Sequence, residues 1–467
     1  MAGNSNRGVY GQGRGKVEPA VGPSTETGCM RATRLWNHGA MSQQHTPLAD
    51  RSPDELQAFL TEQQTAYDDL RNRGLKLDLT RGKPAAAQLD LSKDLLCAPS
   101  GFKTPSGVDV RNYGGLEGIT EIRRLFADLL WVAPEQVVAG GNSSLTMMKD
   151  VLVDLWLKGA IDSPRPWGQE ERVAFICPVP GYDRHFALLD WLGIEMIPVP
   201  IEDDGPDMDA VEQLVADDPQ IKGIWIVPTY ANPSGSVVSD DKARRLASMK
   251  AAAPDFTIMW DNAYAFHHLT EEEAKSADIV SMAAEAGHPH RPIMFASTSK
   301  ITFAGAGVAF LAASTDNVKW YLSHLGMGSI GPDKLNQLRH VEFFENADGV
   351  RAHMAKHREI IAPKFAEVDR ILTERLGGLG VASWTRPSGG YFVSLDVMDG
   401  IATRVVELAK AAGIALTPAG ASFPHGDDPR DRNIRLAPTF PAPAEVSEAM
   451  DAVATCVLLA AAEKLAS

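Results

Sequence analysis

The chain has 467 residues, of which 44% are hydrophobic, and it carries a formal net charge of −15. A chain of this length can form two or three domains around a large buried core. Its acidic balance argues against nucleic acid as the main partner, because phosphate binding needs a basic surface. The sequence contains no run of eighteen apolar residues, so it predicts no membrane span.

The first 40 residues are rich in Gly, Ser and Arg and lack the apolar core of a secretory signal. We expect residues 1–45 to form a disordered extension, with Met41 as the natural first residue. From Ser52, a Ser-Pro-Asp-Glu cap predicts a helix that continues to about Asn72. An extended segment follows over residues 77–84.

Short apolar runs then alternate with helical stretches, including helices at 119–130 and from Ser144 to about Lys158. The predicted strands cover residues 136–139, 172–176, 195–198, 223–227, 257–261, 293–297 and 308–312. This alternation indicates βαβ units and a mainly parallel sheet with helices on both faces. Ligands of such sheets bind at the carboxyl ends of the strands.

After residue 331 the pattern changes to one long predicted helix over residues 334–376. Extended segments are predicted at 382–395 and 433–437, a helix at 402–412, and a final helix from Pro443. These elements predict an α+β unit with its own core, and we expect the N-terminal helix to pack against it.

Four widely spaced cysteines, Cys29, Cys97, Cys177 and Cys456, form no C-x-x-C pair. They predict reduced, mostly buried thiols in a cytoplasmic protein, with neither disulfides nor a zinc site. The adjacent His267 and His268 would point in opposite directions on a strand, so we expect no metal.

Lys300 follows an apolar strand and lies in a Ser297-Thr298-Ser299-Lys300 sequence that leads into a small-residue turn. In a partly desolvated pocket the pKa of a lysine falls, and its free amine can form a Schiff base. The neighbouring hydroxyls suit a phosphate. Taken alone, the same pattern is also that of a surface turn with an ordinary lysine.

Three other stretches point to the same kind of chemistry. Asp261 closes an apolar strand, and a buried carboxylate needs a partner, although a helix N-cap is an alternative. The 141–144 sequence Gly-Asn-Ser-Ser opens a helix, which suits phosphate and also ordinary capping. Arg435 is a lone cation in an apolar segment, where it could bind a substrate carboxylate or form an internal ion pair.

Together these motifs resemble the pyridoxal 5'-phosphate (PLP)-dependent aminotransferases of fold type I, class I, and most closely the actinobacterial-type aspartate aminotransferase subgroup. The resemblance extends from about Leu48 to the C-terminus. It implies an α/β fold with a mainly parallel central sheet and a smaller α+β domain. The implied organisation is an extension at 1–45, the N-terminal part of the small domain and the active-site entrance at 46–100, a large PLP-binding domain at 101–335, and a C-terminal small domain at 336–467.

The resemblance also implies roles for individual residues. Lys300 would carry PLP and move the proton, while Asp261 would pair with the pyridine nitrogen and Tyr264 with the ring hydroxyl. The other implied cofactor-binding residues are Ser143, Ser144, Tyr182, Asn232, Ser297, Tyr113 and His185. The implied substrate-binding residues are Arg435, for the α-carboxylate, with Arg184, Gly82 and Asn232.

One position departs from the family pattern, because Val308 stands where an arginine commonly helps to hold the phosphate. Lys334 and Tyr113 are candidates for replacing it. The cation for the distal carboxylate is also open: we favour Arg184, with Arg81 and Lys83 as alternatives.

The implied reaction is reversible amino transfer between L-aspartate and 2-oxoglutarate, with amino acids and 2-oxo acids as small-molecule partners. The implied assembly is a homodimer with shared active sites, and neither nucleic acid nor membrane is an expected partner. A broader aminotransferase (aromatic, kynurenine or 2-aminoadipate type), a β-lyase and a PLP-dependent regulator are the alternatives.

Overall fold

The computed structural model describes residues 46–467. The predicted N-terminal extension, the expected start at Met41 and Cys29 lie outside these residues. None of the described helices is both long enough and apolar enough to cross a membrane.

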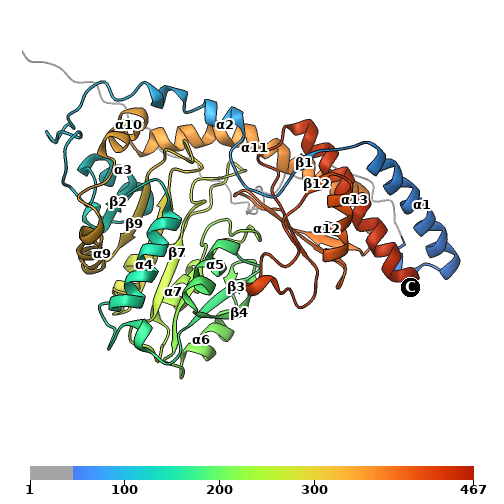
Figure 1. Cartoon of the computed structure of the whole chain (residues 1–467), viewed down its shortest axis with the longest axis horizontal. Coiled ribbons are helices and arrows are strands. Elements are labelled where there is room, and N and C mark those ends of the chain that lie inside the picture. Colours follow the sequence, from blue (N-terminus) through green and yellow to red (C-terminus); the bar gives the residue numbers. More distant parts are fainter. Residues whose placement is uncertain (1–45) are drawn as a thin grey trace, which may run out of the picture. The chain divides into compact units, whose positions relative to one another are not determined.

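The central element is an eight-stranded sheet with the strand order β2-β9-β8-β7-β6-β3-β4-β5 (Figure 1). In chain order its strands are β2 (Val137–Ala139), β3 (Ala174–Val179), β4 (Glu195–Glu202), β5 (Gly205–Pro206), β6 (Ile221–Ile226), β7 (Thr257–Asp261), β8 (Pro292–Ser297) and β9 (Ala309–Ala313). The pairs from β8 through β7, β6 and β3 to β4 are parallel, whereas β2, β9 and β5 pair antiparallel at the edges. The predicted parallel sheet is therefore confirmed at its centre.

Helices cover both faces of this sheet, because its central strands are buried on both sides and need apolar partners on each. One face packs against α4 (Ser144–Lys158), α5 (Asp183–Leu192) and α9 (Thr315–Gly328). The other face packs against α3 (Thr120–Leu130), α6 (Met208–Val215), α7 (Asp240–Ser248), α8 (Ile279–Glu285) and α10 (Lys334–Phe344).

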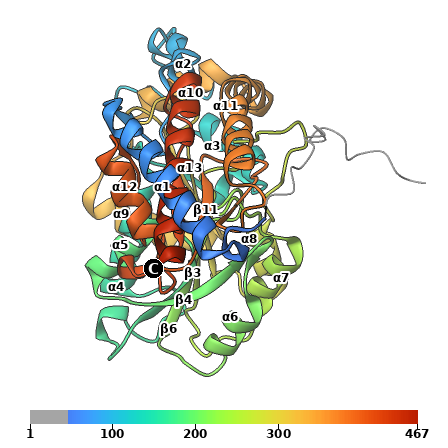
Figure 2. The same ribbon diagram turned by 90° about the vertical axis from the view of Figure 1, so that its right-hand side faces the viewer.

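A separate apolar cluster is built from both ends of the described chain. Helices α1 (Pro53–Asn72) and α13 (Pro443–Ala466) pack side by side, as Figure 2 shows in blue and red. The cluster also contains α12 (Ala402–Ala411), the antiparallel sheet of β10 (Ala382–Trp384), β11 (Val393–Val397) and β13 (Asn433–Leu436), and the short parallel pair β1 (Leu77–Asp78) and β12 (Ile414–Ala415). The expected packing of the N-terminal helix with this unit is confirmed, while the domain boundaries stay predictions.

The predicted continuous helix over 334–376 is wrong. Helix α10 ends at Phe344, and α11 (Ala347–Leu376) begins three residues later. Glu345 adopts a positive φ of 63°, which a continuing helix does not allow, and the Asn346 side chain accepts a hydrogen bond from Gly349 N as the N-cap of α11. Helix α11 then contributes side chains to both large apolar clusters, and short helix α2 (Ala86–Asp90) lies beside it.

Two of the three described cysteines, Cys177 and Cys456, are buried, and burial raises the pKa of both thiols. Cys97 is exposed, so the expectation of mostly buried thiols holds for two of the three described cysteines.

Candidate active site

Several of the predicted site residues lie where the central parallel strands end. Asp261 is the last residue of β7 and Ser297 the last of β8, and these strands pair with each other. Tyr182 follows β3 as the N-cap residue of α5, and Asn232 follows β6. Because parallel strands end at one edge of a sheet, residues far apart in sequence come together there.

Asp261 and His185 form a buried pair, with Asp261 Oδ2 3.0 Å from His185 Nε2. The His185 ring stacks on Trp225 at a centroid distance of 3.9 Å and an interplanar angle of 6°, which fixes its orientation. The second carboxylate oxygen, Oδ1, is buried, and no described residue donates a hydrogen bond to it. Since a buried carboxylate oxygen is costly without a donor, Asp261 is placed to receive one from a bound group.

Lys300 follows β8 in the turn that leads to β9, and its Nζ lies 4.6 Å from the centroid of the Tyr264 ring. Tyr264 is buried, and burial raises the pKa of its hydroxyl. Burial also raises the pKa of Tyr182 to about 12, while the nearby Lys300 opposes this shift. Both phenols are therefore protonated at neutral pH and can donate hydrogen bonds.

The N-terminus of α4 lies beside the Lys300 turn. Ser143 caps this helix, with its Oγ accepting from Thr146 N at 3.3 Å, and Ser144 is its first residue. Asn142 connects the two segments: its side-chain amide donates to Gly305 O at 3.1 Å, and its carbonyl accepts from Ser299 Oγ at 3.0 Å. A helix N-terminus beside a lysine suits a phosphate group, as the sequence predicted.

Arg435 lies on β13 and is buried, with Nη1 2.8 Å from Asp183 Oδ1 and 3.5 Å from Asn232 Oδ1. The internal ion pair, one of the two alternatives that the sequence raised, is therefore present, and the arginine also lies beside the predicted site residue Asn232. The guanidinium carbon of Arg435 lies 5.2 Å from the centroid of the Phe392 ring. Gly82 lies against the Phe392 ring so closely that any side chain there would collide with it. These contacts place Gly82 near the predicted substrate arginine.

Lys334 is not a free partner for a phosphate. It is buried, and its Nζ donates to the carbonyl of Asn112 at 2.7 Å and to that of Gly114. These bonds hold the loop that carries Tyr113, whose side chain is 82% exposed. Val308 is buried, and its N donates to Thr298 Oγ1 at 2.9 Å. Lys334 therefore supports the loop that carries Tyr113, and its role at the phosphate stays a prediction.

The structure does not bring Arg184 to the other site residues. Its side chain is exposed on α5, while the preceding Asp183 contacts Arg435. Arg81 and Lys83 are also exposed, and Lys83 lies 3.9 Å from the centroid of the Phe440 ring. Asp183 was not predicted as a site residue, although a carboxylate beside the predicted stacking Tyr182 was a usable signal.

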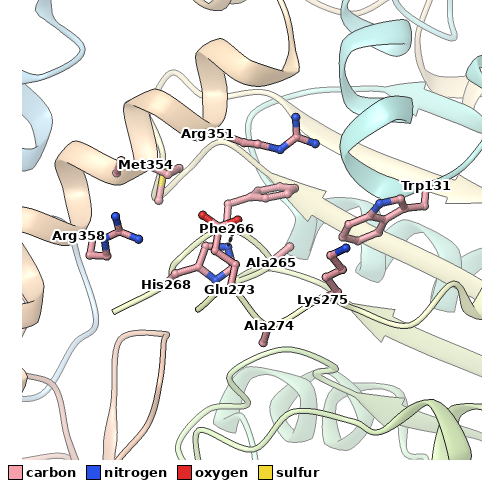
Figure 3. A pocket seen from close by; sticks show the side chains of 11 residues that line it. Trp131, Ala265, Phe266, His268, Glu273, Ala274, Lys275, Arg351, Met354 and Arg358 are labelled. Carbon is pink, nitrogen blue, oxygen red and sulfur yellow. Dashed lines mark ion pairs between the residues drawn. The ribbon is translucent and has the colours of Figure 1, made fainter. Parts of the chain in front are cut away.

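A cavity of about 240 Å³ lies away from these residues (Figure 3). Its side chains come from Trp131, from the segment after β7 that includes Phe266 and Lys275, and from Arg351 and Arg358 of α11. His268 lines it, with its Nε2 3.7 Å from Glu273 Oε2, whereas His267 contacts the Lys300 turn. Within residues 46–467, no cluster of three or more His, Cys, Asp or Glu side chains could hold a metal ion.

Comparisons with known proteins agree with this geometry. The family model described as "Aspartate amino-transferase" matches residues 51–467. A Corynebacterium glutamicum protein named aspartate aminotransferase is 54% identical over 422 residues, covering 90% of this chain and 98% of that protein. A relative from Mycolicibacterium smegmatis, named only as an aminotransferase, is 58% identical over 416 residues, covering 88% and 97%. The crystal structure of an aspartate transaminase from Corynebacterium glutamicum superposes with a TM-score of 0.89 at 54% identity, covering 90% and 99%.

Proposed function

The chain belongs to the aspartate aminotransferase family, and we propose that it transfers an amino group reversibly between L-aspartate and 2-oxoglutarate, giving oxaloacetate and L-glutamate. The predicted fold type I architecture and the predicted enzyme class, an aminotransferase, are confirmed by the family match and by the likeness to the Corynebacterium structure. The two substrates are the part that we propose, from the names of the relatives.

The observation that carries the proposal is the buried Asp261 Oδ1, which has no donor among the described residues. It lies at the end of β7, which pairs with β8, the strand that Lys300 follows. The protonated ring nitrogen of PLP is a donor that fits this oxygen, and His185 holds the other oxygen in place. Bound there, PLP supplies an electron sink for the pair left when the substrate Cα–H bond breaks.

The residues that would hold the cofactor share one edge of the sheet. Lys300 would carry it, Asp261 would bind its nitrogen, and Tyr264 and Asn232 would donate to its ring hydroxyl. Tyr182, at the N-terminus of α5, would cover the ring. The residues proposed for the phosphate are Ser143, Ser144 and Ser297, with Tyr113 reaching the phosphate bound by the neighbouring subunit.

The chain's own residues then have separate tasks in the reaction. The Lys300 amine takes the proton from the substrate Cα as a general base and returns it as a general acid. Arg435 binds the α-carboxylate and fixes the orientation of the Cα–H bond. The buried Tyr264 and the half-buried Tyr182 exclude water and donate hydrogen bonds as neutral phenols.

We also propose a cytoplasmic homodimer. In support, Tyr113 is largely exposed, although it lies on a loop that the buried Lys334 holds in place. A fixed loop with an exposed aromatic side chain suits a contact with a second copy of the chain. Light scattering of the active enzyme measures the assembly, and a fully active monomer would contradict this part of the proposal.

Borohydride reduction of the PLP-loaded enzyme, followed by peptide mapping, tests the site. The pyridoxyl group should be found on Lys300, and its appearance on another lysine would refute the mechanism. A stopped-flow screen of amino acids, read by the cofactor absorbance, tests the substrates. Aspartate and glutamate should react fastest, and preference for an aromatic amino acid, kynurenine or 2-aminoadipate would replace the proposed substrate pair.

A further inference from the structure

Imidazoles from three separate segments contact the turn that carries Lys300: His340 of α10, His353 of α11 and His267 in the segment after β7. His340 of α10 has Nε2 3.2 Å from Thr298 Oγ1 and 3.0 Å from Thr302 Oγ1. His353 of α11 has Nε2 2.9 Å from Ile301 O. The contacts of His340 and His353 are buried, and the residues that they reach flank Lys300 on both sides in sequence.

We propose that His340 and His353 are positioning residues for Lys300, which hold the backbone of its turn so that the lysine amine faces the Tyr264 side of the site. This inference rests on the proposed function only in giving Lys300 a role. The hydrogen bonds that carry it are independent of any cofactor.

The hydrogen-bond partners of His340 determine its protonation state. Its Nδ1 lies 2.8 Å from Asn336 O, a carbonyl that can only accept, so Nδ1 carries the proton. Thr298 Oγ1 already accepts from Val308 N, and its own proton is therefore free to be donated to His340 Nε2. An imidazole that donates at Nδ1 and accepts this proton at Nε2 is neutral. Burial, which lowers the pKa of His340 to about 4, agrees with this assignment.

His353 acts on the other side of the lysine as a donor. Ile301 O can only accept, so His353 Nε2 carries a proton and donates it. The Nε2 atom of His357 lies 3.1 Å from His353 Nε2. Burial is the main cause that lowers the pKa of His357 to about 3, and the neighbouring His353 lowers it further. Two charged imidazoles at this separation would repel strongly, which favours neutral rings.

The network behind His353 returns to the lysine itself. Gln88 Oε1 accepts from Ala85 N at 3.0 Å, so its amide nitrogen faces His357 Nδ1 at 3.0 Å and the Tyr391 hydroxyl at 2.9 Å. The Tyr391 hydroxyl lies 3.4 Å from Lys300 O, and His267 Nε2 lies 3.4 Å from the same carbonyl. The Ile301 carbonyl is thus held by His353 of α11, and the Lys300 carbonyl faces Tyr391 before β11 and His267 after β7.

Neutral histidines suit this task for an electrostatic reason. A charged lysine or arginine could also hold these carbonyls, but it would place a positive charge beside the Lys300 amine and alter its proton affinity. A neutral imidazole supplies the hydrogen bond without that charge. The loop between β8 and β9 contains Gly305 and Gly307, so side chains from outside the loop are needed to fix it.

The test compares His353→Leu and His353→Gln with wild type in the PLP-loaded enzyme. His353→Leu should increase amide hydrogen exchange over residues 298–303 by about tenfold and lower kcat by about tenfold or more, with KM for aspartate changed less than about twofold. The pH at which the cofactor absorbance changes should shift as well. His353→Gln keeps a donor for Ile301 O and should restore most of each property.

Phe344→Leu is the matched control. Phe344 is buried and packs 5.6 Å from the His353 ring, but it makes no hydrogen bond to the turn. It should lower the melting temperature while leaving the exchange of 298–303 and the absorbance titration unchanged. If Phe344→Leu and His353→Leu changed the exchange and the absorbance titration equally, or if glutamine gave no rescue, the histidines would contribute only packing and the proposal would be wrong. Labelling of a lysine other than Lys300 would instead refute the proposed function, while the exchange result would still stand.

Discussion

Arg435 Nη1 lies 2.8 Å from Asp183 Oδ1, although the two residues are 252 positions apart in sequence. Arg435 is 7% exposed, whereas the Asp183 side chain keeps 34% of its surface accessible. A carboxylate of the chain therefore binds one end of the guanidinium that we assign to the substrate α-carboxylate. Asp183 keeps this buried arginine paired, and a substrate has to share or displace it.

We expect Asp183→Asn to strengthen substrate binding, because the amide removes a negative charge that repels the incoming α-carboxylate. KM for aspartate should fall about fivefold, which corresponds to about 1 kcal/mol. The dissociation constant of succinate, a dicarboxylate without an amino group to transfer, should fall by the same factor. Asp190→Asn, an exposed change of the same charge on the same helix, should alter neither constant. Weaker binding in Asp183→Asn would show instead that Asp183 is needed to orient Arg435.

The exposed position of Arg184 changes what we expect from its removal. If Arg184 bound the distal carboxylate, its truncation would cost about 2–5 kcal/mol in kcat/KM for aspartate and much less for phenylalanine. Because the structure leaves Arg184 exposed and places Asp183 at Arg435, we expect Arg184→Ala to change kcat/KM for both substrates by less than about twofold. A loss confined to aspartate would restore the role that the sequence suggested.

Asp261 should matter far more for the reaction than an aspartate that only caps a helix. Asp261→Ala should remain folded and lose transamination by at least about three orders of magnitude, or about 4 kcal/mol of barrier. Asp207 is the comparison, because it caps α6 by accepting from Asp209 N and Ala210 N at 3.1 Å. Asp207→Ala should cost about 1 kcal/mol of stability and leave kcat unchanged. Comparable activity in the two variants would remove Asp261 from the mechanism.

Local sequence signals predicted many elements closely. The apolar run that Asp261 closes predicted β7 at 257–261, and serine capping predicted α4 at 144–158, both as observed. Strand β3 begins at Ala174, two residues later than predicted. The break between α10 and α11 was missed because it depends on a positive φ at Glu345, a residue type that gives no signal for it.

The site divides in the same way. Lys300, Asp261 and the Ser143 cap lie in motifs whose chemistry can be read within a few residues of sequence, and the structure brings these segments to one edge of the sheet. The pairing of Asp183 with Arg435 and the contact of His353 with Ile301 join residues that are distant in the chain. Such contacts depend on how helices pack and which rotamers result, and no local pattern encodes them.

The last prediction concerns stability in acid and uses His340. Burial is the main cause that lowers its pKa to about 4, with Arg339 acting in the same direction and the Asn336 carbonyl and Asp333 opposing it. An unfolded chain carries an ordinary histidine with a pKa of about 6.5. Between these values the unfolded state binds a proton that the folded state does not, so the stability that His340 contributes is complete above about pH 6.5 and is lost as the pH falls toward 4. At pH 5 this loss amounts to about 2 kcal/mol.

In His340→Gln the group no longer titrates, so the difference in unfolding free energy between wild type and variant should shrink by about this amount from pH 7 to pH 5. Urea unfolding at pH 7, 6 and 5 measures it, and the other histidines cancel in the difference. Parallel curves for the two proteins would mean that His340 gains its proton equally in the folded and unfolded states, which would contradict both its burial and the neutral form that we assign to it.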